Sequence, residues 1–97
     1  MIEKNENTMK INSIELKRIN PEGTLQGFAS CILTGDLNLK LCSIGIHHNG
    51  DRYWITFPKL RTPSGELFFS YIPLDNITHH KLEQAIIEKY EKEMRSI

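Results

Sequence analysis

The segment Phe57–Glu66 combines residue types that can bind phosphate. It contains the cations Lys59 and Arg61, two prolines and the pair Ser64-Gly65. Proline fixes the backbone φ angle and Ser-Gly favours a turn, so we expect a stiff, exposed loop between two strands. An Arg guanidinium can donate two hydrogen bonds to one phosphate, and Lys adds a compact charge. The loop is therefore a candidate contact for a nucleic-acid backbone, although a solvent-exposed hairpin turn would use the same residues.

Other cations extend this candidate contact. Residues 37–65 contain four cations against one acid, Asp51, a net charge of +3, although the whole chain has a formal net charge of zero. Because the chain is neutral overall, binding to nucleic acid would depend on cations gathered in one place. Each of them taken alone is more often a solvated surface charge. The supporting candidates are Lys40 and Arg52, followed by Lys17 and Arg18.

Aromatic side chains flank the loop on both sides. In the run Tyr53–Phe57, strand alternation places Trp54 on the face opposite Ile55. If one face of the sheet packs on a helix, rings on the other face need either a second subunit or stacked, unpaired bases to cover them. We favour the dimer interface, since interfaces are a common place for such rings. The residues assigned to this interface or stacking role are Trp54, Phe68 and Tyr71.

Catalytic and metal-binding patterns are not recognised in the sequence. The pairs His47-His48 and His79-His80 and the cysteines Cys31 and Cys42 do not have the short spacing of a zinc site. Adjacent residues in a strand also point to opposite faces, so a His-His pair there rarely chelates. No Ser-His-Asp, Cys-His or paired-carboxylate pattern stands out. We therefore expect that the protein is not an enzyme, uses no metal or other cofactor, and binds no small-molecule substrate.

Composition indicates one small globular domain. The chain has 97 residues, of which 39% are hydrophobic and 25% charged. No apolar run approaches the length of a membrane span, and residues 1–9 are polar and acidic, unlike a signal peptide. We therefore expect a cytoplasmic protein without a membrane partner. Its thiols, Cys31 and Cys42, should be reduced and buried, although a disulfide across a hairpin stays possible.

The elements that must position these residues are a series of strands followed by one helix. Residues 1–8 are polar and aperiodic, which predicts a disordered extension before a single domain at 9–97. The apolar residues alternate up to Leu41 and then continue at Ile44, three residues later, which a regular strand would place on the opposite face. This change in the alternation predicts a β-bulge. Strands are expected at 10–19 (with one irregularity), 25–33, 37–46, 53–57 and 67–72, with turns at Asn20–Gly23, Gly35-Asp36 and His47–Asp51.

The C-terminal part has helical periodicity. Leu82, Ile86 and Tyr90 recur on one face of a helix expected from Ile77 to about residue 94, with Asn76 as its N-cap. The predicted fold is α+β, with an antiparallel sheet of about five strands and one amphipathic C-terminal helix packed on it.

Several short segments carry a family resemblance. They are Met9-Lys10-Ile11, Phe28-Ala29-Ser30, Pro58 with Arg61-Thr62-Pro63 and Gly65-Glu66, and Pro73 with Gln84–Tyr90. Together they resemble the stage V sporulation protein G family, bacterial regulators also called septation proteins, over about residues 9–92. The resemblance implies a small α+β homodimer that binds DNA, and in some members RNA. No catalysis is associated with the family.

The chain also departs from the family pattern. The family loop usually reads Met-Pro-Ser, two basic residues, Thr-Pro-Asp-Gly-Glu, whereas Leu60 replaces one basic residue here and Lys59 replaces the Ser. A charged segment before the closing proline has become aromatic at Phe68–Ile72. This second change favours an alternative function, a protein-interaction module that does not bind nucleic acid. The leading prediction is a bacterial, homodimeric nucleic-acid-binding regulator that uses Lys59, Arg61, Thr62, Arg52 and Lys40.

Overall fold

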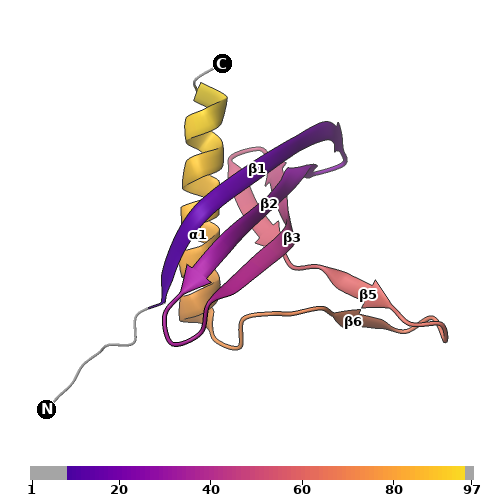
Figure 1. Ribbon diagram of the computed structural model, residues 1–97. Helices are drawn as coiled ribbons and strands as arrows, with labels where there is room; N and C mark the ends of the chain where they lie inside the picture. The colour runs from indigo at the N-terminus through magenta and orange to yellow at the C-terminus, as the bar shows by residue number, and fades with distance from the viewer. Residues whose placement is uncertain (1–8, 96–97) are drawn as a thin grey trace, which may run out of the picture.

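In the part of the chain that the structure describes, six strands are followed by one long helix (Figure 1). A computed structural model describes residues 9–95, and the extension predicted at residues 1–8 lies outside the described residues. The elements are β1 (Lys10–Glu22), β2 (Leu25–Thr34), β3 (Leu39–Asn49), β4 (Arg52–Thr56), β5 (Lys59–Arg61), β6 (Leu67–Phe69) and α1 (Asn76–Arg95).

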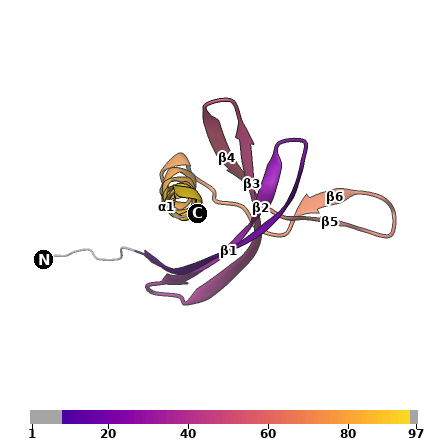
Figure 2. The same cartoon turned by 90° about the horizontal axis from the view of Figure 1, so that it is seen from above.

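The strands form two antiparallel sheets. One has four strands in the order β1-β2-β3-β4, and the other contains β5 and β6 alone. The helix lies along one face of the four-stranded sheet, and β5 and β6 extend away on the other side (Figure 2). The α+β prediction is confirmed, but the strands are divided between two sheets. The division follows Pro58, which cannot donate a backbone hydrogen bond and therefore ends the pairing begun by β4.

The core lies between the four-stranded sheet and α1. Alternation in β2 buries Ala29 and Cys31 and leaves Phe28 on the opposite face. The helix buries its predicted apolar stripe, and Tyr90 meets the ring of Tyr53 edge-on at a centroid distance of 6.0 Å. The sheet contributes Ala29, Cys31, Leu33, Ile44, Ile46, Ile55 and Phe57 to the core, and the helix contributes Leu82, Ile86 and Tyr90.

Both predicted strand irregularities are confirmed. Ser13 and Ser43 have positive φ angles of 51° and 62°, and the pairing register shifts beside each of them. The shift at Ser43 explains why Leu41 and Ile44, three residues apart, both reach the core side of β3. Cys42 follows Leu41, so it points to the opposite face and is exposed. The prediction of two buried thiols is therefore wrong for this residue, and both cysteines are free.

Two turns differ from the prediction. The strand β1 runs through Asn20 to Glu22, so the turn begins at Gly23 rather than at Asn20. The turn predicted at His47–Asp51 contains only Gly50 and Asp51, and both His47 and His48 belong to β3. In each turn a glycine with φ near +62° takes the first of two positions, as in the type II′ turns that match the twist of a hairpin.

The helix is capped by Asp75 rather than by the predicted Asn76. Its carboxylate accepts hydrogen bonds from the Thr78 backbone N–H at 2.7 Å and from the Thr78 hydroxyl at 3.0 Å. These hydrogen bonds lower the pKa of Asp75 because they favour the ionised carboxylate. One of the first backbone donors of α1, the Thr78 N–H, is satisfied in this way by the residue just before the helix.

Candidate nucleic-acid interface

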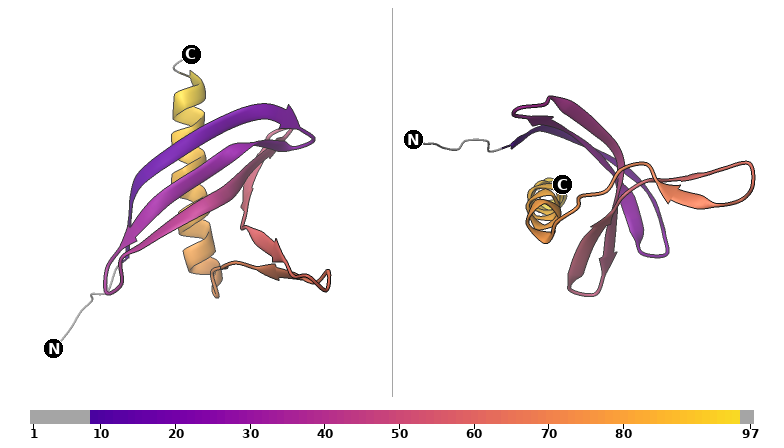
Figure 3. Two further views of the ribbon diagram at one scale, coloured as in Figure 1. Left: turned by 45° about the vertical axis from the view of Figure 1, so that its right-hand side comes forward. Right: turned by 90° about the horizontal axis from the view of Figure 1, so that it is seen from below.

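Most of the segment predicted as a loop forms a short antiparallel hairpin with the strand expected after it, and we call this hairpin the arm (residues 58–70). Backbone hydrogen bonds of 2.8 Å extend its ladder at both ends, from Ser70 N–H to the Pro58 carbonyl and from Thr62 N–H to the Glu66 carbonyl. The arm stands away from the four-stranded sheet and the helix (Figure 3). Its second strand ends at Phe69, three residues before the predicted end. The paired residues are Lys59 with Phe69, Leu60 with Phe68, and Arg61 with Leu67.

The tip of the arm is held by its own hydrogen bonds. The Thr62 hydroxyl lies 2.9 Å from the Ser64 hydroxyl and accepts the Glu66 backbone N–H at 3.2 Å. Arg61 Nη1 donates to the Gly65 carbonyl at 3.0 Å, and Gly65 has a φ of 93°, which favours glycine. The predicted stiff turn therefore has an explicit basis, and Thr62 contributes to it by organising the tip.

The arm has two chemically different faces. Cross-strand partners share a face, and successive residues of a strand alternate between faces. One side, the apolar face, presents Leu60 and Phe68, which are 65% and 55% exposed. The other side, the cationic face, presents Lys59 and Arg61 together with their partners Phe69 and Leu67.

A groove of about 490 Å³ lies where the arm leaves the sheet. Lys59 and Phe69 line it from the cationic face, and the Lys59 ammonium group lies 4.9 Å from the centre of the Phe69 ring. His47 and Thr56 line it from β3 and β4, and His79 from the first turn of α1. The cationic face of the arm is thus continuous with the sheet.

Two predicted residues lie next to this groove on the face of the sheet opposite α1. The ring of Trp54 stacks on His47 with 5.4 Å between centroids and 7° between planes. The Arg52 guanidinium lies 5.2 Å from the centre of the Trp54 ring. Phe69, which lines the groove, and Trp54, which stacks on the groove residue His47, therefore each have a cation over the ring.

His47 is fixed in orientation by hydrogen bonds at both ring nitrogens. Nδ1 lies 2.9 Å from the Thr24 hydroxyl, and Nε2 lies 2.9 Å from the Thr56 hydroxyl. Burial lowers the pKa of His47, which favours a neutral ring. The bond to Thr56 crosses Gly45, where an added Cβ would lie only 2.6 Å from the Thr56 hydroxyl oxygen. A glycine is needed at this position for the bond to form.

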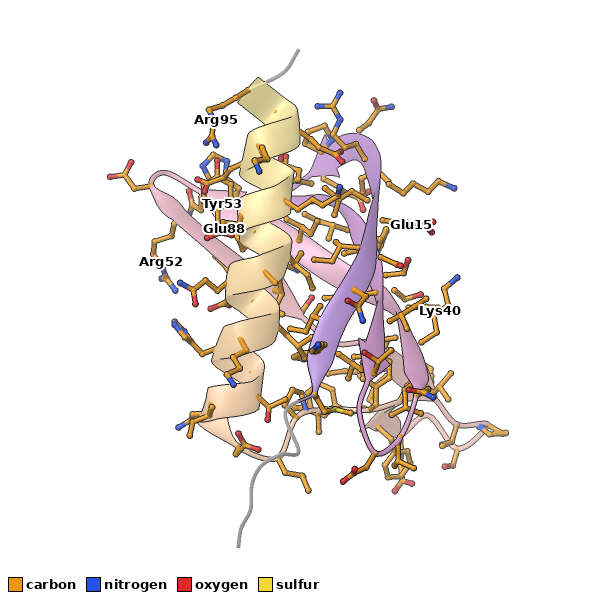
Figure 4. The ribbon with its side chains drawn as sticks, turned by 60° about the vertical axis from the view of Figure 1, so that its left-hand side comes forward. Glu15, Lys40, Arg52, Tyr53, Glu88 and Arg95 are labelled. Atoms are coloured by element: carbon orange, nitrogen blue, oxygen red, sulfur yellow. The ribbon has the colours of Figure 1, made fainter. Side chains whose placement is uncertain are left out.

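The remaining predicted residues are not gathered at the groove. Lys40 and Arg52 point away from each other on opposite sides of the molecule (Figure 4). Phe68 lies on the apolar face of the arm. Tyr71 donates its hydroxyl to the Cys42 carbonyl and packs edge-on against Phe57 with 5.8 Å between centroids. Burial raises the pKa of Tyr71 to about 12, consistent with a packing role inside the monomer.

One acid lies close to the groove. The Glu83 carboxylate on α1 accepts a hydrogen bond from the Ile55 backbone N–H at 3.2 Å and lies 3.8 Å from His79 Nε2. His79 in turn meets the ring of Phe57 edge-on, with 5.5 Å between centroids. These contacts fix the helix against β4 and occupy the Glu83 carboxylate.

The sequence-based prediction did not include His47 or Phe69 among the site residues. His47 was placed in a turn, and Phe69 was not distinguished from its neighbours. The alternation that placed Trp54 opposite Ile55 would have placed His47 opposite Ile46 if β3 had been extended past residue 46. Phe69 could be found only from the hairpin register, which pairs it with Lys59.

The sequence pattern predicts neither a metal site nor a membrane-spanning segment. Across residues 9–95, no group of three or more His, Cys, Asp or Glu side chains is arranged to hold a metal ion. Within the same described part, α1 does not combine the length and apolar character that crossing a membrane requires.

Comparison with known proteins identifies the family. The sequence model named SpoVG matches residues 9–92. A septation protein SpoVG of Caldanaerobacter subterraneus subsp. tengcongensis is 31% identical, and the match covers 87% of this chain and 90% of that protein. Its counterparts in Thermoanaerobacter sp. and Oceanobacillus iheyensis are 29% and 27% identical, again over 87% of this chain and over 89% and 85% of their own lengths. This chain belongs to the SpoVG family.

Proposed function

We propose that this protein is a cytoplasmic, homodimeric nucleic-acid-binding regulator of the sporulation and septation type, acting by binding rather than by catalysis. The observation that carries the proposal is the cationic face of the arm. Lys59 and Arg61 are exposed there, on a hairpin held away from the body of the molecule. The groove at the base of the arm is lined by Lys59 and His47, and His47 stacks on Trp54, over which Arg52 lies.

The chemistry of the cationic face suits a phosphate backbone. The Arg61 guanidinium is oriented by its bond to the Gly65 carbonyl, so less side-chain freedom is lost when it meets a ligand. The ladder and the tip hydrogen bonds keep the two cations at a fixed spacing. Contacts of this kind bind many sequences and weaken as salt rises, because bound counterions are released from the nucleic acid.

The apolar face of the arm supports the homodimer. An isolated two-stranded hairpin is at best marginally stable in water, and Leu60 and Phe68 leave more than half of their surface exposed. A two-fold axis would place the same face of a second copy against it, and pairing would cover these exposed side chains. A dimer also presents two cationic faces, so two weak phosphate contacts would act at high effective concentration.

A charge-removal experiment tests the proposal. The double variant Lys59→Ala/Arg61→Ala should bind a mixed pool of DNA or RNA oligonucleotides more weakly in a fluorescence-polarisation titration at low salt. Its mass in light scattering should stay that of the wild-type chain, because the apolar face is unchanged. A matched variant, Lys81→Ala/Lys89→Ala, removes two cations from α1 and should bind like the wild type. Equal binding by the arm variant and the wild type would refute the role of the arm.

The alternative function, a protein-interaction module without nucleic-acid binding, is favoured by the exposed Leu60 and Phe68. The salt dependence of binding distinguishes the two proposals. Binding to phosphates should fall steeply between low and moderate salt, whereas an apolar protein contact should persist.

A further inference from the structure

We propose that the groove at the base of the arm seats an unpaired base of a single-stranded nucleic acid, with the flanking phosphates on Lys59 and Arg52. This inference rests on the proposed function and specifies its ligand. The groove of about 490 Å³ lies within the size range of roughly 300–1,000 Å³ that is usual for ligand sites.

The rings at the groove supply surfaces for stacking. Phe69 lines it from the arm and is 47% exposed. His47 lines it from the sheet, where its ring is already parallel to Trp54. Both His47 nitrogens are occupied by the hydroxyls of Thr24 and Thr56, so this ring offers a fixed aromatic surface rather than a charged contact for phosphate. Such platforms accept any base, because every base has an aromatic face.

The charges at the groove match the same ligand. The Lys59 ammonium group lies over the ring of Phe69, and the Arg52 guanidinium lies over the ring of Trp54, which stacks on His47, so a cation accompanies each of the two stacking surfaces. In a single strand each base is likewise followed by a phosphate. The nearby acid, Glu83, is engaged by the Ile55 N–H and lies next to His79, which reduces its repulsion of a bound phosphate.

A duplex does not fit this description. Its bases are stacked on one another and expose only their edges in the grooves, so they cannot lie flat against Phe69 or His47. Unpaired bases of a single strand can be turned outward and stacked on aromatic side chains. The groove therefore favours single strands, and the stacking chemistry is common to DNA and RNA.

The groove stays open in the proposed dimer. It is lined by Lys59 and Phe69 from the cationic face, whereas the second copy would contact Leu60 and Phe68 on the opposite side of the arm. A second copy seated in the groove is the competing occupant, and the experiment below includes it as an outcome.

The test compares three probes in fluorescence polarisation at one salt concentration. They are a single-stranded oligonucleotide in DNA and RNA versions, its duplex, and an abasic strand of equal length that keeps the phosphates. The single strand should bind more tightly than the abasic strand by about 5- to 150-fold, the range expected for one stacked base. Phe69→Ala should abolish most of this difference in affinity and leave the affinity for the abasic strand unchanged. The single Trp of the chain, Trp54, should be quenched by the single strand but not by the abasic strand.

The matched control is Phe68→Ala, which removes an equally large ring from the other face of the arm. It should weaken the dimer and lower both affinities together, so the ratio of single-strand to abasic binding should not change. Equal wild-type affinities for the single strand, the duplex and the abasic strand would overturn the base seat while leaving phosphate binding in place. No binding to any probe would overturn the proposed function as well. Loss of the dimer mass on Phe69→Ala would show that a second copy occupies the groove and would also overturn the inference.

Discussion

Removing the apolar face of the arm should separate the proposed dimer without unfolding the chain. The perturbation is the double variant Leu60→Ser/Phe68→Ser. Both side chains project from the arm, and neither belongs to the buried core between the sheet and α1. The fold of the monomer should therefore survive, as a circular dichroism spectrum and a thermal melt can verify.

The expected size of the effect follows from the exposed area. Full burial of a Leu or Phe side chain is worth about 1.5–3 kcal/mol. Leu60 and Phe68 are 65% and 55% exposed, so covering what remains gives roughly 1–2 kcal/mol for each side chain. A symmetric dimer covers both residues of each copy, so the substitutions should cost about 4–7 kcal/mol, or roughly a 10³- to 10⁵-fold weaker dimer.

Sedimentation equilibrium over a wide range of protein concentration measures this change directly. The control Leu74→Ser removes a side chain that is 96% exposed outside the arm, and it should leave the dissociation constant unchanged. If the double variant and the wild-type chain dissociate over the same concentration range, the apolar face is not the contact between copies.

Three other perturbations test the structure around the site. Replacing Asp75 by Ala should destabilise α1 at neutral pH. Because the folded-state pKa of Asp75 is lowered, its contribution is present above the ordinary value of 3.8 and is lost as pH falls through the folded value, so melts of the two proteins should converge in acid. Gly45→Ala should cost about 1–3 kcal/mol in urea unfolding, and adding Thr56→Ala should recover part of it by removing the clash. A thiol reagent should modify the exposed Cys42 in the native protein and reach Cys31 only on unfolding, since Cys31 is buried and burial raises the pKa of its thiol.

Much of the fold could be predicted because local patterns and tertiary packing agree. The alternation around Ala29 and the helical spacing of Leu82, Ile86 and Tyr90 each define one buried face, and the structure buries that face. The parity change between Leu41 and Ile44 identified the bulge at Ser43, because no regular strand can put both residues on one side.

Other features depend on competition between nearly equal residues. Asp75 and Asn76 are both good N-caps, and only the contact of Asp75 with Thr78 decides between them. Cys42 lies in an apolar run, which suggested burial, but it follows Leu41 and therefore points to the face opposite the core.

The candidate site was predicted as separate parts. Lys59 and Arg61 were identified from residue type, and Trp54 from alternation, and the structure places them on or beside one continuous surface. The joining residue, His47, was missed because the turn was expected to begin there, whereas β3 continues to Asn49. The first strand of the arm, β5, was predicted as part of a loop, since Pro58 and Pro63 suggested irregular chain and a three-residue strand gives almost no period to detect.

The hydrogen bond from Ile55 to Glu83 has a consequence for how copies of this chain can assemble. An edge strand normally offers its unpaired backbone groups to any passing strand, and this is how sheets grow into aggregates. At the β4 edge a helix side chain already takes the Ile55 N–H, and at the opposite edge the bulge at Ser13 interrupts the regularity of β1. Both edges of the four-stranded sheet are thus poorly suited to pairing with a further strand. An assembly built through the arm would close at two copies instead of extending into a fibre.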